Sequence, residues 1–114
     1  MRVPLYQAKA EFFRMLGHPV RIRVLELLAD GPMPVRDLLG AIEVEASNLS
    51  QQLAVLRRAG IVTASRQGPT VVYALAGPDV TDLLQAARRI LTELIAGREE
   101  LLTELREAAA EQAG

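Results

Sequence analysis

Residues 45–62 read EASNLSQQLAVLRRAGIV, and this stretch combines an apolar stripe with an uncharged polar surface. Leu49, Leu53 and Leu56 recur at helical spacing, with Val55 and Ala59 beside them, so one side of a short helix is apolar. The glycine at position 60 follows where helices commonly end in a left-handed residue. The stretch therefore predicts a helix that packs through its leucines and stops before residue 61.

The opposite side of this predicted helix carries amides and hydroxyls in place of charges. These side chains are Ser47, Asn48, Ser50, Gln51 and Gln52. They can donate and accept hydrogen bonds, which suits base edges and phosphates in a DNA major groove. A polar cap on an ordinary helix would have the same composition, so the helix alone leaves both interpretations open.

The totals indicate one domain with an aliphatic core. The chain has 114 residues, of which half are hydrophobic and only 4% aromatic, so Leu, Val, Ile and Ala must fill the core. There is no cysteine, which excludes disulfides, thiolate metal sites and thiol redox sensing. No apolar run approaches the roughly 20 residues of a membrane span, and the first four residues do not resemble an export signal. We therefore expect a cytoplasmic protein that does not enter a membrane.

The net charge of −1 hides an uneven distribution along the chain. Residues 46–78 hold Arg57, Arg58 and Arg66 and no acid, whereas residues 79–114 hold four bases and eight acids. A DNA-facing surface needs a local positive field and not a basic whole protein. Three positive charges are few, so we expect two copies of the chain to bind together.

Three further helices are predicted before residue 45. Apolar spacing predicts the first over residues 5–16 and the second over residues 19–30, with Arg21, Arg23 and Glu26 on the wetter side of the second. Proline at position 19 suits the first turn of a helix. A short third helix covers residues 35–42, and residues 43–45 connect it tightly to the helix described above. This order of elements is a helix-turn-helix pattern.

After residue 60 the apolar period changes from helical to two, which predicts a β-hairpin. Residues 61–67 and 70–76 are rich in β-branched side chains and flank Gln67-Gly68-Pro69. Glycine at position 68 permits a positive φ at the tip. In the second strand we expect Val71, Tyr73 and Leu75 to face the core. A hairpin directly after a recognition helix would be the wing of a winged helix.

From residue 79 onward the chain has one long helical pattern. We expect Gly97 to interrupt this helix and residues 108–114 to form a frayed tail. Its apolar band is unusually wide and comprises Val80, Leu83, Leu84, Ala87, Ile90, Leu91, Leu94, Ile95, Leu101, Leu102 and Leu105. A free-standing helix of this kind would bury little and be marginally stable. Packing against a second copy in a twofold dimer would cover the band.

Three motifs follow one another along the chain: LGHPVRIRVL at residues 16–25, LSQQLAVLRRAGIV at 49–62 and VYAL at 72–75. In this order they resemble those of the arsenic-repressor (ArsR) family of bacterial dimeric winged-helix repressors, and the resemblance covers roughly residues 10–95. It implies a mainly α fold with a β-hairpin wing, and a homodimer that binds palindromic operator DNA and releases it when an effector binds. Residues 1–114 would then form one DNA-binding domain, with the helices at about 5–16 and about 79–107 at the dimer interface.

The resemblance also assigns site residues. Recognition-helix contacts would come from Ser47, Asn48, Ser50, Gln51 and Gln52, and wing contacts from Arg66, Gln67, Gly68 and Thr70. Two interpretations stay open for Arg57 and Arg58: they contact phosphates, or they lie on a solvated surface. The dimer interface would include Leu5, Phe12, Leu84, Ala87, Leu91 and Leu94.

Departures from the family pattern concern metals above all. Many members carry two cysteines near the positions of Pro34 and Arg36, and others bind metal through Asp, His, His and Glu, where this chain has Gly77, Asp79, Ile90 and Glu93. We therefore expect no metal and no cofactor. The missing cysteines argue against arsenite, lead, cadmium or persulfide as the effector, which stays unknown. Position 52 is histidine in most members, and Pro69 replaces a common basic residue at the wing tip, which would weaken wing contact.

His18, the only histidine, has a structural and a metal-binding interpretation. A zinc site takes about three or four ligands, so a capping role at the junction with Pro19 is favoured. We expect no enzyme, because the chain has no cysteine, no glycine-rich phosphate loop and no paired carboxylates beside an apolar pocket. Glu99, Glu100 and Glu104 fit a solvated helix face. The rival function is a winged helix that binds another protein and has no DNA target.

Overall fold

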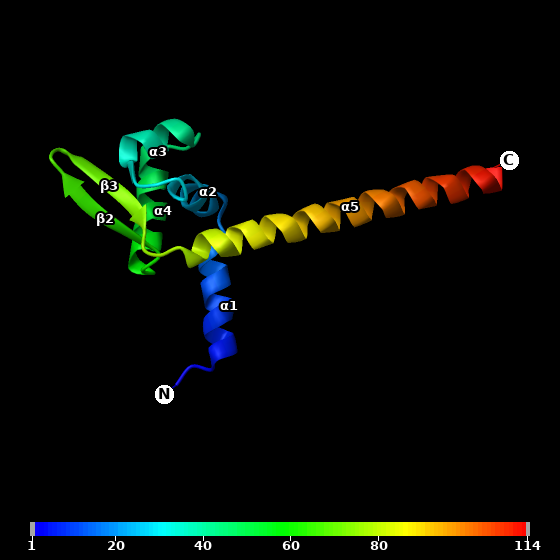
Figure 1. The fold of residues 1–114 in the computed structure, drawn as a ribbon, viewed down its shortest axis with the longest axis horizontal. Coiled ribbons are helices and arrows are strands. Elements are labelled where there is room, and N and C mark those ends of the chain that lie inside the picture. The colour runs from blue at the N-terminus through cyan, green and yellow to red at the C-terminus, as the bar shows by residue number, and fades with distance from the viewer. Residues whose placement is uncertain (1, 114) are drawn as a thin grey trace. The chain divides into compact units, whose positions relative to one another are not determined.

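The computed structural model describes residues 2–113 and contains five helices and three strands in that range (Figure 1). Their order is α1 (Leu5–Leu16), α2 (Pro19–Leu28), β1 (Met33–Pro34), α3 (Val35–Ala41), α4 (Ala46–Arg58), β2 (Val62–Gln67), β3 (Thr70–Leu75) and α5 (Asp79–Ala113). The described residues form two compact units, which divide between Thr81 and Asp82 within α5. The predicted bounds of α1 are confirmed, whereas α2 and α3 end two residues and one residue earlier than expected.

The core of the first unit is aliphatic, as the composition predicts. Its buried side chains are Leu16, Val24, Leu25, Leu28, Leu38, Leu49, Leu53, Leu56 and Val62. The leucines of α4 pack against α2 and β2. Burying one such side chain contributes about 1.5–3 kcal/mol, so this packing fixes the rotation of α4 about its axis.

The predicted capping role of His18 is confirmed. His18 is the N-cap of α2, with an extended backbone, and its Nδ1 accepts a hydrogen bond from the backbone N–H of Val20 at 3.1 Å. Pro19 occupies the first turn, where its missing N–H leaves no donor without a partner.

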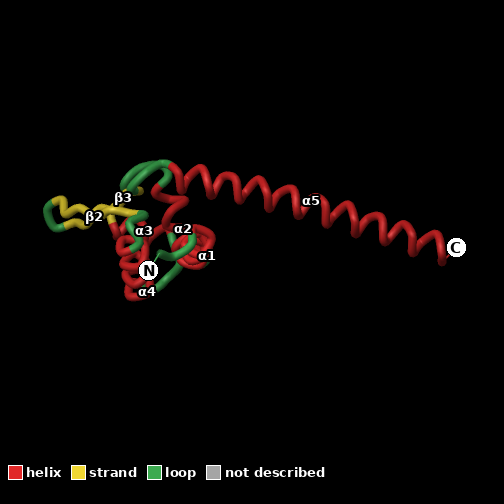
Figure 2. The backbone as a smooth tube through the Cα atoms, turned by 90° about the horizontal axis from the view of Figure 1, so that it is seen from below, coloured by secondary structure: helices red, strands yellow, loops and turns green. Residues whose placement is uncertain are grey.

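The sheet has three antiparallel strands in the order β1-β3-β2. Figure 2 shows the hairpin of β2 and β3 in yellow. The hairpin register runs from Val62 opposite Leu75 to Gln67 opposite Thr70, which confirms the predicted hairpin. The sequence did not indicate β1, whose two residues pair with Val72 and Tyr73. The prediction that Val71, Tyr73 and Leu75 face the core stays a prediction, because every residue of this middle strand is half-buried. The neighbouring strands flank β3 on both edges, and α2 and α3 pack against it.

Two glycines adopt the left-handed backbone that the sequence predicts for them. Gly60 has φ of 79° and follows Ala59, the C-cap of α4, and Gly68 has φ of 64° at the tip of the hairpin. Such values are costly for residues with a Cβ, so both turns depend on glycine.

The second unit is one continuous helical segment. The predicted interruption at Gly97 is wrong, since α5 runs without a break from Asp79 to Ala113. A single helical glycine costs only about 1 kcal/mol relative to alanine, too little to break a helix of this length. Residues 108–113, predicted to fray, are helical because alanine is the best helix former. The last residue of the predicted frayed tail lies outside the described residues.

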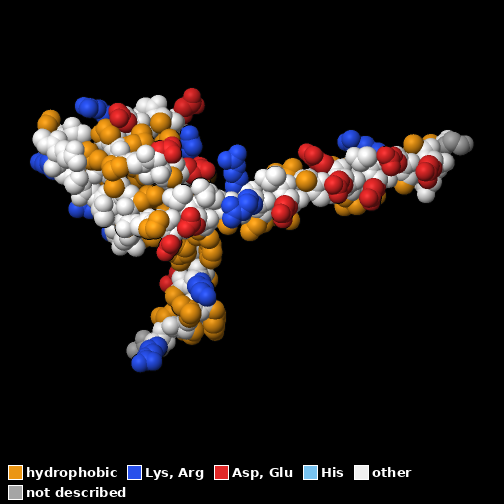
Figure 3. Space-filling view, in the orientation of Figure 1, with side chains coloured by type: hydrophobic (Ala, Val, Ile, Leu, Met, Phe, Trp, Pro, Cys, Tyr) orange, Lys and Arg blue, Asp and Glu red, His pale blue; other side chains and the backbone are white. Residues whose placement is uncertain are grey.

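Large apolar side chains line α5 without protein cover. Seven of them are at least 44% exposed: Ile90, Leu91, Leu94, Ile95, Leu101, Leu102 and Leu105. Figure 3 shows hydrophobic side chains along α5, interspersed with acidic and basic ones. Within residues 2–113, no helix combines the length and the hydrophobicity that a bilayer crossing demands.

Candidate nucleic-acid interface

The exposed face of α4 is a stripe of small and uncharged polar residues that ends in an arginine. Ser47, Gln51, Ala54 and Arg58 follow one another at intervals of four, three and four residues, which places them on one side of the helix. All four are exposed, and Ser50 is exposed beside them. The buried leucines on the opposite side hold this stripe toward solvent.

Position 52 departs from the sequence-based prediction. Gln52 was expected on the exposed polar face with its neighbours, but its side chain is only 8% exposed, so that expectation is wrong. Helical spacing puts it on the flank of α4, and α2 covers this flank. Arg21 of α2 donates from Nε to Gln52 Oε1 at 2.8 Å, and Gln52 Nε2 donates to Asn48 Oδ1 at 2.9 Å.

Arg21 also differs from its predicted place on the wetter side of α2. The side chain is half-buried, and its Nη1 donates to the backbone carbonyl of Met15 at 2.7 Å. Every buried side-chain nitrogen or oxygen in residues 2–113 has a hydrogen-bond partner, including those of this network. Arg21 therefore joins the end of α1, α2 and α4 by directed hydrogen bonds.

The arginines in and near α4 form no ion pair with a carboxylate among residues 2–113. Arg57 and Arg58 lie in the last turn of α4 and Arg66 in β2, and all three are exposed. The ion pairs found among the described residues join Arg23 to Glu26 at 3.7 Å and Arg36 to Asp37 at 3.9 Å. Neither pair involves residues 46–78, so this segment keeps its positive field.

The wing presents the residues that the sequence assigned to it. Arg66, Gln67 and Gly68 are exposed, and Thr70, the first residue of β3, is half-buried. Side chains alternate between the two faces of a strand, so Arg66 and Gln67 point to opposite sides of the hairpin.

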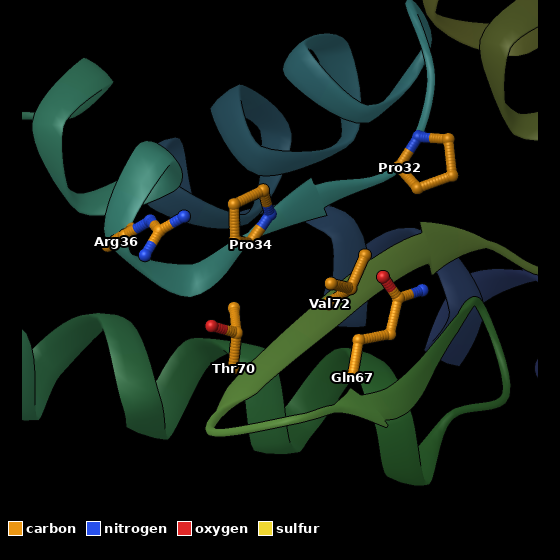
Figure 4. Close-up of a pocket in the computed structure, with 6 residues that line it drawn as sticks. All are labelled: Pro32, Pro34, Arg36, Gln67, Thr70 and Val72. Atoms are coloured by element: carbon orange, nitrogen blue, oxygen red, sulfur yellow. The ribbon is translucent and has the colours of Figure 1, made fainter.

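A groove lies between the tip half of the wing and the segment that leads into α3 (Figure 4). Its volume is about 410 Å³, and it is lined by Pro32, Pro34, Arg36, Gln67, Thr70 and Val72. Pairing of β1 with β3 brings the segment before α3 alongside the hairpin. Sequence reasoning missed Arg36 as part of this surface, because a two-residue strand gives no recognisable pattern.

Among residues 2–113, no group of three or more His, Cys, Asp or Glu side chains is arranged to hold a metal ion. The polar groups brought together on this unit are instead amides, hydroxyls and guanidinium groups. Such groups suit recognition by hydrogen bonding and charge.

Comparison with known proteins agrees with this geometry. Residues 18–64 match the family described as bacterial regulatory protein, arsR family. The HTH-type transcriptional regulator Rv0081 of Mycobacterium tuberculosis is 50% identical over 104 residues, which cover 90% of this chain and 91% of the relative. The chain belongs to the ArsR family. It is therefore a winged-helix transcriptional regulator, and the resemblance found in the sequence is confirmed.

Solved structures of similar proteins share the fold. The crystal structure of Rv0081 superposes with a TM-score of 0.78 over 85% of this chain and 98% of that one, at 50% identity. The transcriptional repressor BigR from Xylella fastidiosa gives 0.70 at 33% identity, over 75% and 87% of the two chains. The homodimeric winged helix-turn-helix DNA-binding domain Mb0332 from Mycobacterium bovis gives 0.70 at 28% identity, over 80% and 84%.

Proposed function

We propose that this ArsR-family regulator binds double-stranded operator DNA as a homodimer and represses transcription until an effector releases it. The observation that carries the proposal is the exposed stripe of α4, which offers uncharged donors and acceptors and is flanked by arginines without carboxylate partners. The major groove of B-DNA is about 12 Å wide and admits one helix. BigR, which shares this fold at 33% identity, is a transcriptional repressor, and this supports repression as the outcome.

Base contacts are assigned to Ser47, Asn48, Ser50 and Gln51, in the first half of α4. Helix-turn-helix proteins read base edges with the N-terminal residues of the recognition helix, and no acid lies in the first turn of α4. Gln52 supports this surface from within and does not contact DNA directly.

Backbone contacts are assigned to the arginines and the wing. Arg58 shares the exposed stripe with Gln51, and Arg57 lies on the flank beside Ser50, so both can reach phosphates on either side of the groove. The wing contributes Arg66, Gln67, Gly68 and Thr70. The groove beside it places Arg36 near Gln67 and Thr70, which adds a fourth cation to the DNA-facing set.

Dimerisation is assigned to the uncovered apolar faces of α1 and α5. Leu5, Leu91 and Leu94 are more than half exposed in the single chain, and Phe12, Leu84 and Ala87 are half-buried. A soluble chain rarely leaves so many large apolar side chains in water without a partner. The homodimeric Mb0332 domain supports a second copy as that partner. Two recognition helices would then enter successive major grooves about one helical turn apart, and an effector would act by changing their separation.

Fluorescence anisotropy on the DNA upstream of the gene, over a salt series, tests the DNA-binding role. Eight arginines, four from each chain, give an expected slope of log K against log salt of about −7. Ser50→Ala and Gln51→Ala should relax sequence preference, whereas Arg57→Ala and Arg58→Ala should weaken binding to all sequences alike. Unchanged affinity in all four variants would refute the assignment. Absence of any preference for the upstream DNA would favour the protein-binding alternative.

A further inference from the structure

A directed chain of hydrogen bonds connects the end of α1 to the DNA-facing side of α4. Arg21 Nη1 donates to the Met15 carbonyl at 2.7 Å, and its Nε donates to Gln52 Oε1 at 2.8 Å. Gln52 Nε2 then donates to Asn48 Oδ1 at 2.9 Å. Asn48 is the only member of the chain on the polar surface assigned to base contacts.

The arginine fixes the direction of every bond in this chain. A guanidinium group has donors and no acceptor, so Gln52 can meet it only through its amide oxygen. The amide nitrogen of Gln52 is then turned toward Asn48, which must present its own oxygen. A flip of either amide would set nitrogen against nitrogen, and Gln52 is too deeply buried for water to replace the lost partner.

We infer that Asn48 faces DNA as a hydrogen-bond donor, and that Arg21 and Gln52 are positioning residues that hold it so. The inference rests on the proposed function and specifies how one residue of that site reads bases. With Oδ1 directed inward to Gln52, the outward group is the Nδ2 amine. Guanine presents two adjacent acceptors, O6 and N7, in the major groove, so guanine is the base that this amine selects.

The substitution Gln52→Glu tests the inference without changing any group that touches DNA. The introduced carboxylate still accepts from Arg21 Nε, but it cannot donate to Asn48. Asn48 gains a hydrogen bond only by turning its amine inward, which exposes Oδ1 to the base. The preferred base at that one pair should therefore change from guanine to one with an exocyclic amine, cytosine or adenine.

Competition anisotropy with every single-base variant of the operator gives the preference at each position. Wild type should prefer guanine at one pair of each half-site, and Asn48→Ala should flatten that preference by roughly tenfold. Gln52→Glu should move the preference at the same pair and leave the others unchanged. A uniform loss of affinity with no change in base preference in Gln52→Glu would overturn the inference, as would an intact profile in Asn48→Ala.

Two controls distinguish failure of this inference from failure of the proposed function. Gln51→Ala reports on the exposed stripe alone: if it flattens another position while Asn48→Ala changes nothing, the inference fails and the proposed function stands. If wild type shows no preference among operator variants, the proposed function fails first. Thermal unfolding checks each variant. Should Gln52→Glu not fold, Gln52→Met fills a similar volume without a polar group and should broaden the preference at that pair, whereas an unchanged preference would overturn the inference.

Discussion

The uncovered apolar band of α5 makes a quantitative prediction about self-association. Leu94 is 64% exposed in the single chain, and fully burying a leucine contributes about 1.5–3 kcal/mol, so covering the exposed part contributes about 1–2 kcal/mol. A twofold interface contains the residue twice, which doubles the loss to about 2–4 kcal/mol. Leu94→Ala should therefore raise the dimer dissociation constant roughly 30- to 700-fold.

The comparison between variants is cleaner than the absolute affinity. Wild type and Leu94→Ala lose the same translational and rotational freedom on association, so this large cost cancels in their difference. Alanine also has the higher helix propensity, so α5 should remain helical. Sedimentation equilibrium measures the dissociation constant, and far-ultraviolet circular dichroism checks the helix.

The matched control is Glu100→Ala, because residue 100 lies six positions from Leu94, which at 100° per residue places it about 120° around the helix. This exposed carboxylate lies outside the apolar band, so its removal should change the dissociation constant less than threefold. If Leu94→Ala also stays within threefold of wild type, this part of the band does not lie in a dimer interface, and the reasoning is refuted.

Three further predictions follow from local geometry. His18→Ala should lower the free energy of unfolding, measured with urea, by about 1 kcal/mol, because the Val20 N–H loses its hydrogen-bond acceptor. An unchanged urea midpoint would show that water replaces the His18 side chain as acceptor. Gly60→Ala should cost about 1–2 kcal/mol because φ is 79°, whereas Gly40→Ala, helical and with open space for a Cβ, should stabilise by about 0.5–1 kcal/mol; equal effects would contradict the argument from φ. Arg36→Ala should weaken binding to all DNA sequences alike and reduce the salt slope by about 2 in a dimer; a change confined to one base pair would contradict phosphate contact.

The sequence predicted α4 well because three independent signals agree there. Leucines at helical spacing, a run of neutral polar residues between them and a glycine at the end all require the same helix in the same rotation. The burial of Leu49, Leu53 and Leu56 confirms this rotation. The wing was equally predictable, because the change of apolar period and the glycine at its tip indicate one turn.

The role of Gln52 could not be predicted in this way. Its place on the flank of α4 follows from helical spacing, but whether a neighbouring helix covers that flank depends on how α2 packs. Glutamine suits a solvent-facing contact and a satisfied buried amide equally well. Only the position of Arg21, which the amphipathic pattern of α2 assigned to solvent, distinguishes the two.

The small number of cations makes DNA affinity depend on dimerisation, and this dependence separates two kinds of variant. One half-site has at most four arginines, whereas the linked second half-site binds at a high effective concentration. Leu94→Ala should therefore bind operator weakly at low protein concentration and regain affinity as concentration rises past its dimer dissociation constant. Arg58→Ala should stay weak at every concentration, because its dimer is intact and its phosphate contact is lost. Identical concentration dependence in the two variants would show that α5 and α4 do not have the separate roles assigned to them.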